Sequence, residues 1–96
     1  MDTETQEKLN SVFAKHLGIE KVILYGSRAK GNFKNGSDID LTLFAPLLSL
    51  KNLLQIENEI DDLFLPYKVD LSLYHFIDHL QLQEHINRVG LLFYKK

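Results

Sequence analysis

Three aspartates stand in segments that read as β-strands, and their spacing suggests shared chemistry. Asp38 and Asp40 lie two residues apart in a segment whose apolar residues alternate, so their side chains share one face. Asp70 lies in a second alternating segment, again on the polar face. Aspartate is disfavoured inside strands, and three carboxylates on neighbouring strands repel one another unless cations are bound. The pattern therefore predicts a divalent-metal site.

Mg²⁺ suits such a site because it prefers carboxylate oxygens and completes its shell with water and phosphate oxygens. Mn²⁺ is the alternative ion. Two ions about 3.5–4 Å apart can clamp the attacking and leaving oxygens of a phosphoryl displacement, so we expect two.

A loop with phosphate-binding features lies between the first two strands. Gly26 lets a phosphate approach the backbone, and Ser27 adds a hydroxyl donor at the start of an expected helical turn. Arg28 and Lys30 add positive charge, and Lys34 completes a local basic cluster. One loop thus offers phosphate binding and the strand after it offers metal ligands, which together predict a nucleoside-triphosphate site.

Each feature also has an ordinary interpretation. The Asp38–Asp40 pair alone fits a solvated strand face, and Gly26-Ser27 alone fits a plain turn. Arg28 and Lys30 could serve as loop charges or pair with an acid, so their contact with phosphate stays open. The combined spacing of the acids and the glycine loop favours the triphosphate site.

The remaining aromatic and histidine residues have plainer interpretations. Tyr25 and Phe33 flank the loop, where packing is favoured over stacking on a base. Zinc binding by His75 and His79 is disfavoured because a helix capped by Asp78 would begin after His75. His16 and His85 are expected on the surface.

Composition excludes several classes of protein. The chain has 96 residues, a net charge of -2 and no cysteine, so we expect one domain over residues 1–96 and no disulfide scaffold or zinc finger. The near balance of charges argues against direct nucleic-acid binding. No apolar run is long enough to span a bilayer, and the polar start is unlike a signal peptide. We therefore expect a cytoplasmic protein with no membrane partner.

Hydrophobic periodicity predicts helices alternating with strands, which favours an α/β (α+β) sandwich of helices on a sheet. Thr3 with Gln6, and Asp78 with Gln81, are typical of capping boxes, and Ser49 is expected to cap the middle helix. The predicted helices span about 4–17, 49–65 and 78–90, and the strands about 21–25, 38–44, 68–74 and 91–94. Apolar residues at helical spacing should face the core: Leu9, Val12, Phe13, Leu17, Leu53, Ile56, Ile60, Leu63, Phe64, Leu82, Ile86 and Val89.

The chain resembles a known family at these same residues. One motif resembles the signature of the nucleotidyltransferase superfamily that includes polymerase-beta-like enzymes. It consists of Gly26-Ser27, followed after ten residues by Asp38-Ile39-Asp40. The string YGSRAKGNFKNGSDIDLTLF resembles its smallest branch, the minimal nucleotidyltransferases (MNT). Val69-Asp70-Leu71 resembles the strand of the third acid, and residues 86–94 resemble the C-terminal end of the family.

This resemblance implies a single nucleotidyltransferase domain with a mixed sheet flanked by helices. It also implies transfer of a nucleoside monophosphate from a triphosphate, with ATP as the expected donor, to an acceptor, releasing pyrophosphate. Gly26 and Ser27 would hold the triphosphate, Asp38 and Asp40 would ligate the metals, and Asp70 would join one metal and help deprotonate the acceptor hydroxyl.

The resemblance further implies a partner. MNT proteins are commonly encoded beside a helical HEPN protein as a toxin–antitoxin pair, in which the MNT antitoxin can neutralise the toxin by adding AMP. A catalytically idle antitoxin that acts by stoichiometric contact is the alternative. A weaker one is modification of a small molecule in a pocket completed by dimerisation. The base, the acceptor, and the choice between homodimer and hetero-oligomer stay open.

Overall fold

A computed structural model describes residues 2–31 and 37–96 of the chain. Helices and strands alternate along it, as the periodicity predicts. In chain order the elements are α1 (Thr3–Ala14), β1 (Lys21–Tyr25), α2 (Ser27–Lys30), β2 (Ile39–Phe44), α3 (Leu50–Asp61), β3 (Val69–Leu73), the 3₁₀-helix η1 (Tyr74–Phe76), α4 (Leu80–Val89) and β4 (Leu91–Lys95).

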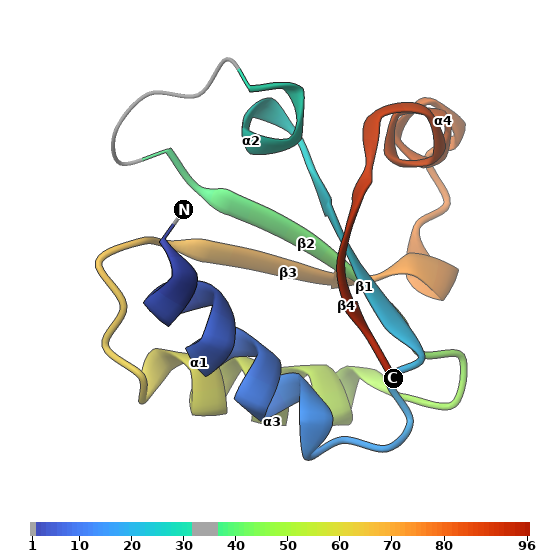
Figure 1. Cartoon of the computed structure of the whole chain (residues 1–96). Helices are drawn as coiled ribbons and strands as arrows, with labels where there is room; N and C mark the ends of the chain where they lie inside the picture. The colour runs from blue at the N-terminus through green and yellow to red at the C-terminus, as the bar shows by residue number, and fades with distance from the viewer. Residues whose placement is uncertain (1, 32–36) are drawn as a thin grey trace.

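The strands form one mixed sheet in the order β3-β2-β1-β4. β1 pairs antiparallel with β2 and β4, whereas β2 and β3 are parallel and are joined by the crossover through α3. Helices α1 and α3 lie on one side of the sheet, and α2 and α4 lie on the other (Figure 1). The mixed sheet flanked by helices confirms the expected fold class.

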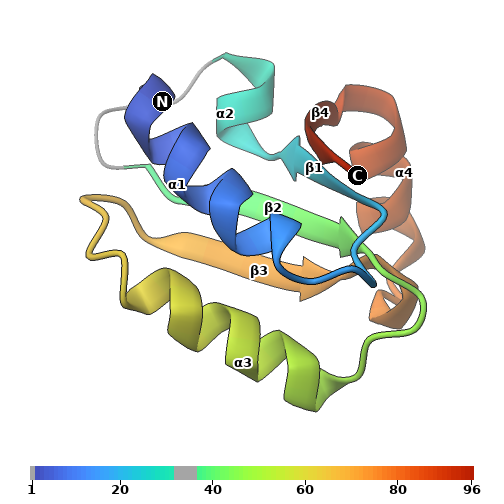
Figure 2. The same ribbon diagram turned by 60° about the horizontal axis from the view of Figure 1, so that its bottom comes forward.

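The core lies between the sheet and the layer of α1 and α3, which Figure 2 brings toward the viewer. The alternating apolar residues of β2 and β3 face this layer, so their polar partners face the opposite side. The fully buried large apolar side chains are Leu9, Val12, Phe13, Ile19, Val22, Ile39, Leu41, Leu43, Ile56 and Leu73. Burial on this face fixes which face the aspartates of β2 and β3 occupy.

Helix α1 begins and ends earlier than expected. Its N-cap is Asp2, whose carboxylate accepts the Thr5 N–H, and Thr3 is the first helical residue, so the Thr3 cap was wrong. The helix ends at Ala14, and Leu17 is 75% exposed instead of facing the core. The chain leaves the helix early because Ile19, rather than Leu17, enters the core.

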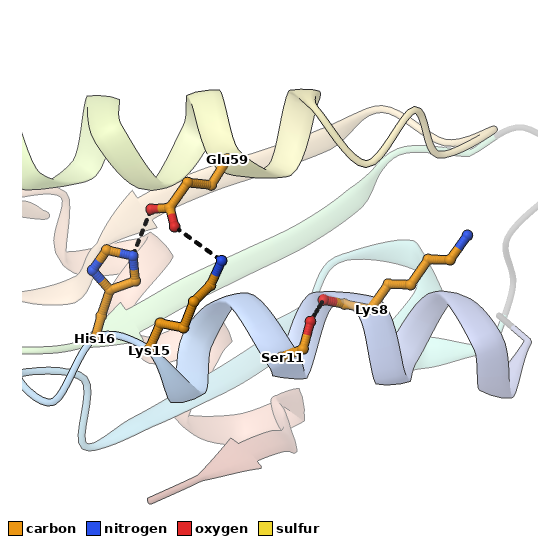
Figure 3. Close-up of polar contacts among 5 residues, drawn as sticks. All are labelled: Lys8, Ser11, Lys15, His16 and Glu59. Atoms are coloured by element: carbon orange, nitrogen blue, oxygen red, sulfur yellow. Dashed lines mark hydrogen bonds and ion pairs between the residues drawn. The ribbon is translucent and has the colours of Figure 1, made fainter.

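Polar contacts tie the end of α1 to α3 beneath the sheet. Glu59 of α3 accepts from His16 Nε2 at 2.6 Å and pairs with Lys15 Nζ at 3.4 Å (Figure 3). His16 is half-buried in this contact, so its expected place on the open surface was wrong. These two contacts of Glu59 help to hold together α1 and α3, the helices that support β2 and β3.

The caps of the later helices agree in part with the sequence. Ser49 caps α3, with Asn52 completing the capping box. Phe64 is 88% exposed at a φ of 51°, because α3 ends at Asp61 and the chain turns before Phe64 can face the core. Helix α4 is capped by His79 rather than Asp78. No helix in residues 2–31 and 37–96 is long and apolar enough to cross a membrane.

Candidate functional site

Asp40 and Asp70 lie side by side across the parallel pair of strands. Asp40 is in register with Asp70 of β3, and on its other side with Tyr25 of β1. The three side chains therefore form a row on the sheet face opposite α1 and α3. This arrangement places the third acid on the strand next to Asp40, where the sequence predicts it.

Asp38 lies just outside the row. β2 begins at Ile39, so Asp38 is an exposed residue immediately before the strand, two residues before Asp40. Its negative charge nevertheless acts on the Asp40 carboxyl. Asp38 thus belongs to the same acidic patch without being held by the sheet.

The acidic patch is electrostatically unfavourable on its own. Burial raises the pKa of Asp40 above its ordinary value, and the negative charges of Asp70 and Asp38 raise it further, while His85 opposes this rise. Burial also raises the pKa of Tyr25, as do Asp40 and Asp70. A cation bound among these side chains would relieve the repulsion.

Gly26 lies directly against the Asp40 carboxylate. Its φ of 76° and ψ of -156° lie outside the regions that side chains tolerate, and a Cβ there would overlap with Oδ2 of Asp40 and lie 3.3 Å from its Cγ. Residue 26 must therefore be glycine for two independent reasons. The glycine turn and β2 form one compact unit.

Ser27 begins the single helical turn α2, which confirms the expected turn after the glycine. The Lys30 N–H bonds back to the Gly26 carbonyl at 3.2 Å, and Gly31 ends the turn with a φ of 80°. Ser27 is half-buried, and Lys30 is exposed. Lys34 and Phe33 fall outside the described residues.

Arg28 points into the protein. It is 8% exposed, and its Nε and Nη2 donate to the Ser37 carbonyl at 3.1 and 2.9 Å. Its guanidinium also lies over the Tyr67 ring, 4.8 Å from the centroid. These contacts favour a structural role at the base of the loop, and direct contact of Arg28 with phosphate stays a prediction.

His85 is a neighbour of the glycine turn that the sequence interpretation missed. It is half-buried on α4, where its Nε2 accepts the Gly26 N–H at 3.4 Å and its ring meets Tyr25 edge-on at 6.3 Å. The expectation of a surface residue was wrong. The spacing of the helix could have indicated this position. His85 follows Leu82 by three residues and precedes Val89 by four, so it lies on the same face of the helix as these apolar residues.

The family of the chain follows from a comparison that covers nearly all of it. A family model described as polymerase beta, nucleotidyltransferase, matches residues 7–96. The chain belongs to this family. No curated protein matched this nucleotidyltransferase.

Solved structures share the nucleotidyltransferase fold. A toxin–antitoxin with AMP-PNP matches with a TM-score of 0.76 and 17% identity, over 95% of this chain and 73% of that one. The toxin–antitoxin MntA-HepT matches with a TM-score of 0.73 and 14% identity, over 99% of this chain and 74% of that one. A complex of tri-AMPylated Shewanella oneidensis HEPN toxin with MNT antitoxin matches with a TM-score of 0.73 and 15% identity, over 100% of this chain and 74% of that one.

The donor set of this nucleotidyltransferase fits a hard divalent cation in ligand type, although Asp38 does not lie close enough to Asp40 and Asp70 to complete a group of three ligands. Within the part of the chain that the structure describes, no three acidic, histidine or cysteine side chains lie close enough together to hold a metal ion. The ligand type nevertheless suits Mg²⁺, since Asp38, Asp40 and Asp70 are oxygen donors whose repulsion a cation would relieve.

Proposed function

We propose that this nucleotidyltransferase transfers AMP from ATP to a hydroxyl group of a HEPN-type toxin and thereby acts as its antitoxin. The observation that carries the proposal is the register of Asp40 with Asp70, next to a glycine turn that lies directly against the Asp40 carboxylate. A triphosphate at the turn and an acceptor at the sheet edge would meet at these two acids.

Asp38, Asp40 and Asp70 would hold Mg²⁺, or Mn²⁺, in one or two positions. Such ions neutralise charge on the phosphates and on the developing oxyanions of a phosphoryl transfer. The raised pKa of Asp40 in the free chain supports this assignment, because an acid that other acids repel gains most from a cation.

The chain's own residues would position the two substrates. Gly26 and Ser27 would receive the triphosphate, and Lys30, exposed on the last residue of α2, would add a positive charge. Asp70 would accept the proton of the acceptor hydroxyl, because it is exposed on the edge strand β3. The acceptor oxygen then bonds to the α-phosphorus as the bond to the bridging oxygen breaks, and pyrophosphate leaves.

The solved structures support the proposed partner. Three that share this fold are toxin–antitoxin complexes, one with AMP-PNP and one with a tri-AMPylated HEPN toxin. An AMP donor and a HEPN acceptor for this chain extend those observations by analogy of fold.

A second candidate function is a catalytically idle antitoxin that blocks the toxin by binding. One observation favours it: among the described residues, no three acidic, histidine or cysteine side chains lie close enough together to hold a metal ion. The two candidates predict opposite results when the acids lose their charge.

The deciding experiment uses Asp38→Asn, Asp40→Asn and Asp70→Asn together with a co-expressed HEPN partner. Each variant keeps the shape of the side chain, so binding of the partner should persist. Transfer from ATP carrying a radioactive α-phosphate should fall by about a hundredfold or more, as expected when electrostatic stabilisation of a transition state is lost. Protection of cells by all three variants would instead establish the idle antitoxin.

A further inference from the structure

His85 brings α4 into contact with the turn that the proposed function assigns to the triphosphate. Its Nε2 accepts the Gly26 N–H at 3.4 Å, and its ring packs edge-on against Tyr25, the residue before the glycine. Helix α4 packs on β1. It lies on the side of the sheet opposite α1 and α3 (Figure 1), so this histidine reaches the turn from a separate layer. Two contacts from one ring thus hold two consecutive residues.

The Gly26 conformation needs such support. Its φ of 76° and ψ of -156° belong to a region that glycine enters readily, and leaves as readily, so contacts with neighbouring groups decide whether the turn keeps this conformation. The Asp40 carboxylate occupies the space next to its Cα. The His85 ring accepts its N–H, so side chains from β2 and α4 both contact this residue.

We propose that His85 is a positioning residue for the triphosphate: it holds the Tyr25–Gly26 peptide in the conformation that receives the phosphates. The proposal rests on the proposed function, since it assigns His85 to the nucleotide side of that site. Acceptance at Nε2 places the ring proton on Nδ1 when the ring is neutral. His85 acts through the turn, and Mg²⁺ binding remains with the three aspartates.

Substitutions at residue 85 separate this role from simple packing. His85→Ala removes the acceptor, whereas His85→Gln keeps an amide oxygen within reach of the Gly26 N–H, and His85→Leu keeps bulk without an acceptor. Gln81→Ala changes an exposed residue of the same helix and serves as the matched control. Thermal melts identify any variant that does not fold.

The first measurement follows the Gly26 amide by NMR in the full chain without nucleotide. Its resonance should shift in His85→Ala and His85→Leu, return toward the wild-type position in His85→Gln, and stay unchanged in Gln81→Ala. An unmoved Gly26 resonance in His85→Ala overturns the contact itself. This measurement does not depend on any enzymatic activity.

The second measurement is calorimetric titration with Mg²⁺–ATP. Loss of one neutral hydrogen bond should weaken binding about three- to tenfold in His85→Ala and His85→Leu, with recovery in His85→Gln. Equal binding by wild type and His85→Ala assigns the ring to packing alone and overturns the proposal. Tighter binding by His85→Ala also overturns it, because the ring would then compete with phosphate for the Gly26 N–H.

The two measurements keep this proposal distinct from the proposed function. A wild-type chain that binds no Mg²⁺–ATP refutes the proposed function and the role of His85 with it, even if the Gly26 amide still reports the contact. A wild-type chain that binds Mg²⁺–ATP while His85→Ala binds equally well refutes the role of His85 alone.

Discussion

Gly26 and Asp40 fit against each other so closely that residue 26 has no room for a side chain. The glycine directly follows β1 and the aspartate lies in β2, so the antiparallel pairing of Tyr25 with Asp40 brings them together. The glycine turn and β2 are consequently one mechanical unit, and a change in either should affect the other.

Gly26→Ala should therefore destabilise the chain more than Gly31→Ala. Both glycines have positive φ, but a Cβ at residue 31 meets nothing within 4 Å, so Gly31→Ala costs only backbone strain of about 1–2 kcal/mol. Gly26→Ala adds the overlap with Asp40. Denaturant unfolding of both variants measures the difference, and equal losses would contradict the close fit.

Asp40→Asn should stabilise the metal-free chain at neutral pH, because it removes the cost of burying the Asp40 charge and the repulsion from Asp70 and Asp38. The folded pKa of Asp40 is raised above 3.8, so folding favours its protonated form. The stability that protonated Asp40 contributes to the folded state is fully present below pH 3.8 and is lost as the pH rises through the raised folded pKa. The melting temperature of Asp40→Asn should therefore exceed that of wild type at about pH 7 and approach it at about pH 3.

The same pair of proteins tests metal binding. Mg²⁺ added at neutral pH should raise the melting temperature of wild type through preferential binding to the folded state, and should do so less for Asp40→Asn. ATP should bind more tightly in the presence of Mg²⁺, and EDTA should reverse this gain. ATP affinity indifferent to metal would exclude the proposed carboxylate site.

Arg28→Met and Lys30→Met should act on different properties. Arg28 is buried with two donors on one carbonyl, so its loss should lower the free energy of unfolding by about 1–3 kcal/mol. Lys30 is exposed, so its loss should leave stability within about 0.5 kcal/mol while weakening ATP binding. Melts and ATP titrations of both variants distinguish the roles, and normal stability in Arg28→Met would contradict its structural assignment.

The strands and the acidic pair were predictable from the sequence because alternation reports directly on which face is buried. Asp40 and Asp70 oppose runs of buried apolar residues, and this places both on one face whatever the details of the loops. The turn after Gly26 was predictable for a similar reason, since a glycine after an apolar strand is a local signal.

Other features depended on contacts that leave no local signal. One partner of Arg28 is the backbone carbonyl of Ser37, which no side-chain pattern reveals. Asp2 and His79 replaced the expected caps because neighbouring residues have similar capping chemistry, and tertiary packing decides between them. Prediction of the His85 contact with the glycine turn required both the helical spacing of α4 and the placement of that helix over β1.

The parallel pairing of β2 and β3 makes the site sensitive to strand register. A slip of β3 by one residue would turn Asp70 toward the core and Leu71 toward solvent, since successive side chains point to opposite faces. Leu71 and Leu73 oppose such a slip because both are buried in the core. The hydrophobic core on one side of the sheet thus fixes the strand register that keeps Asp40 and Asp70 aligned on the other side.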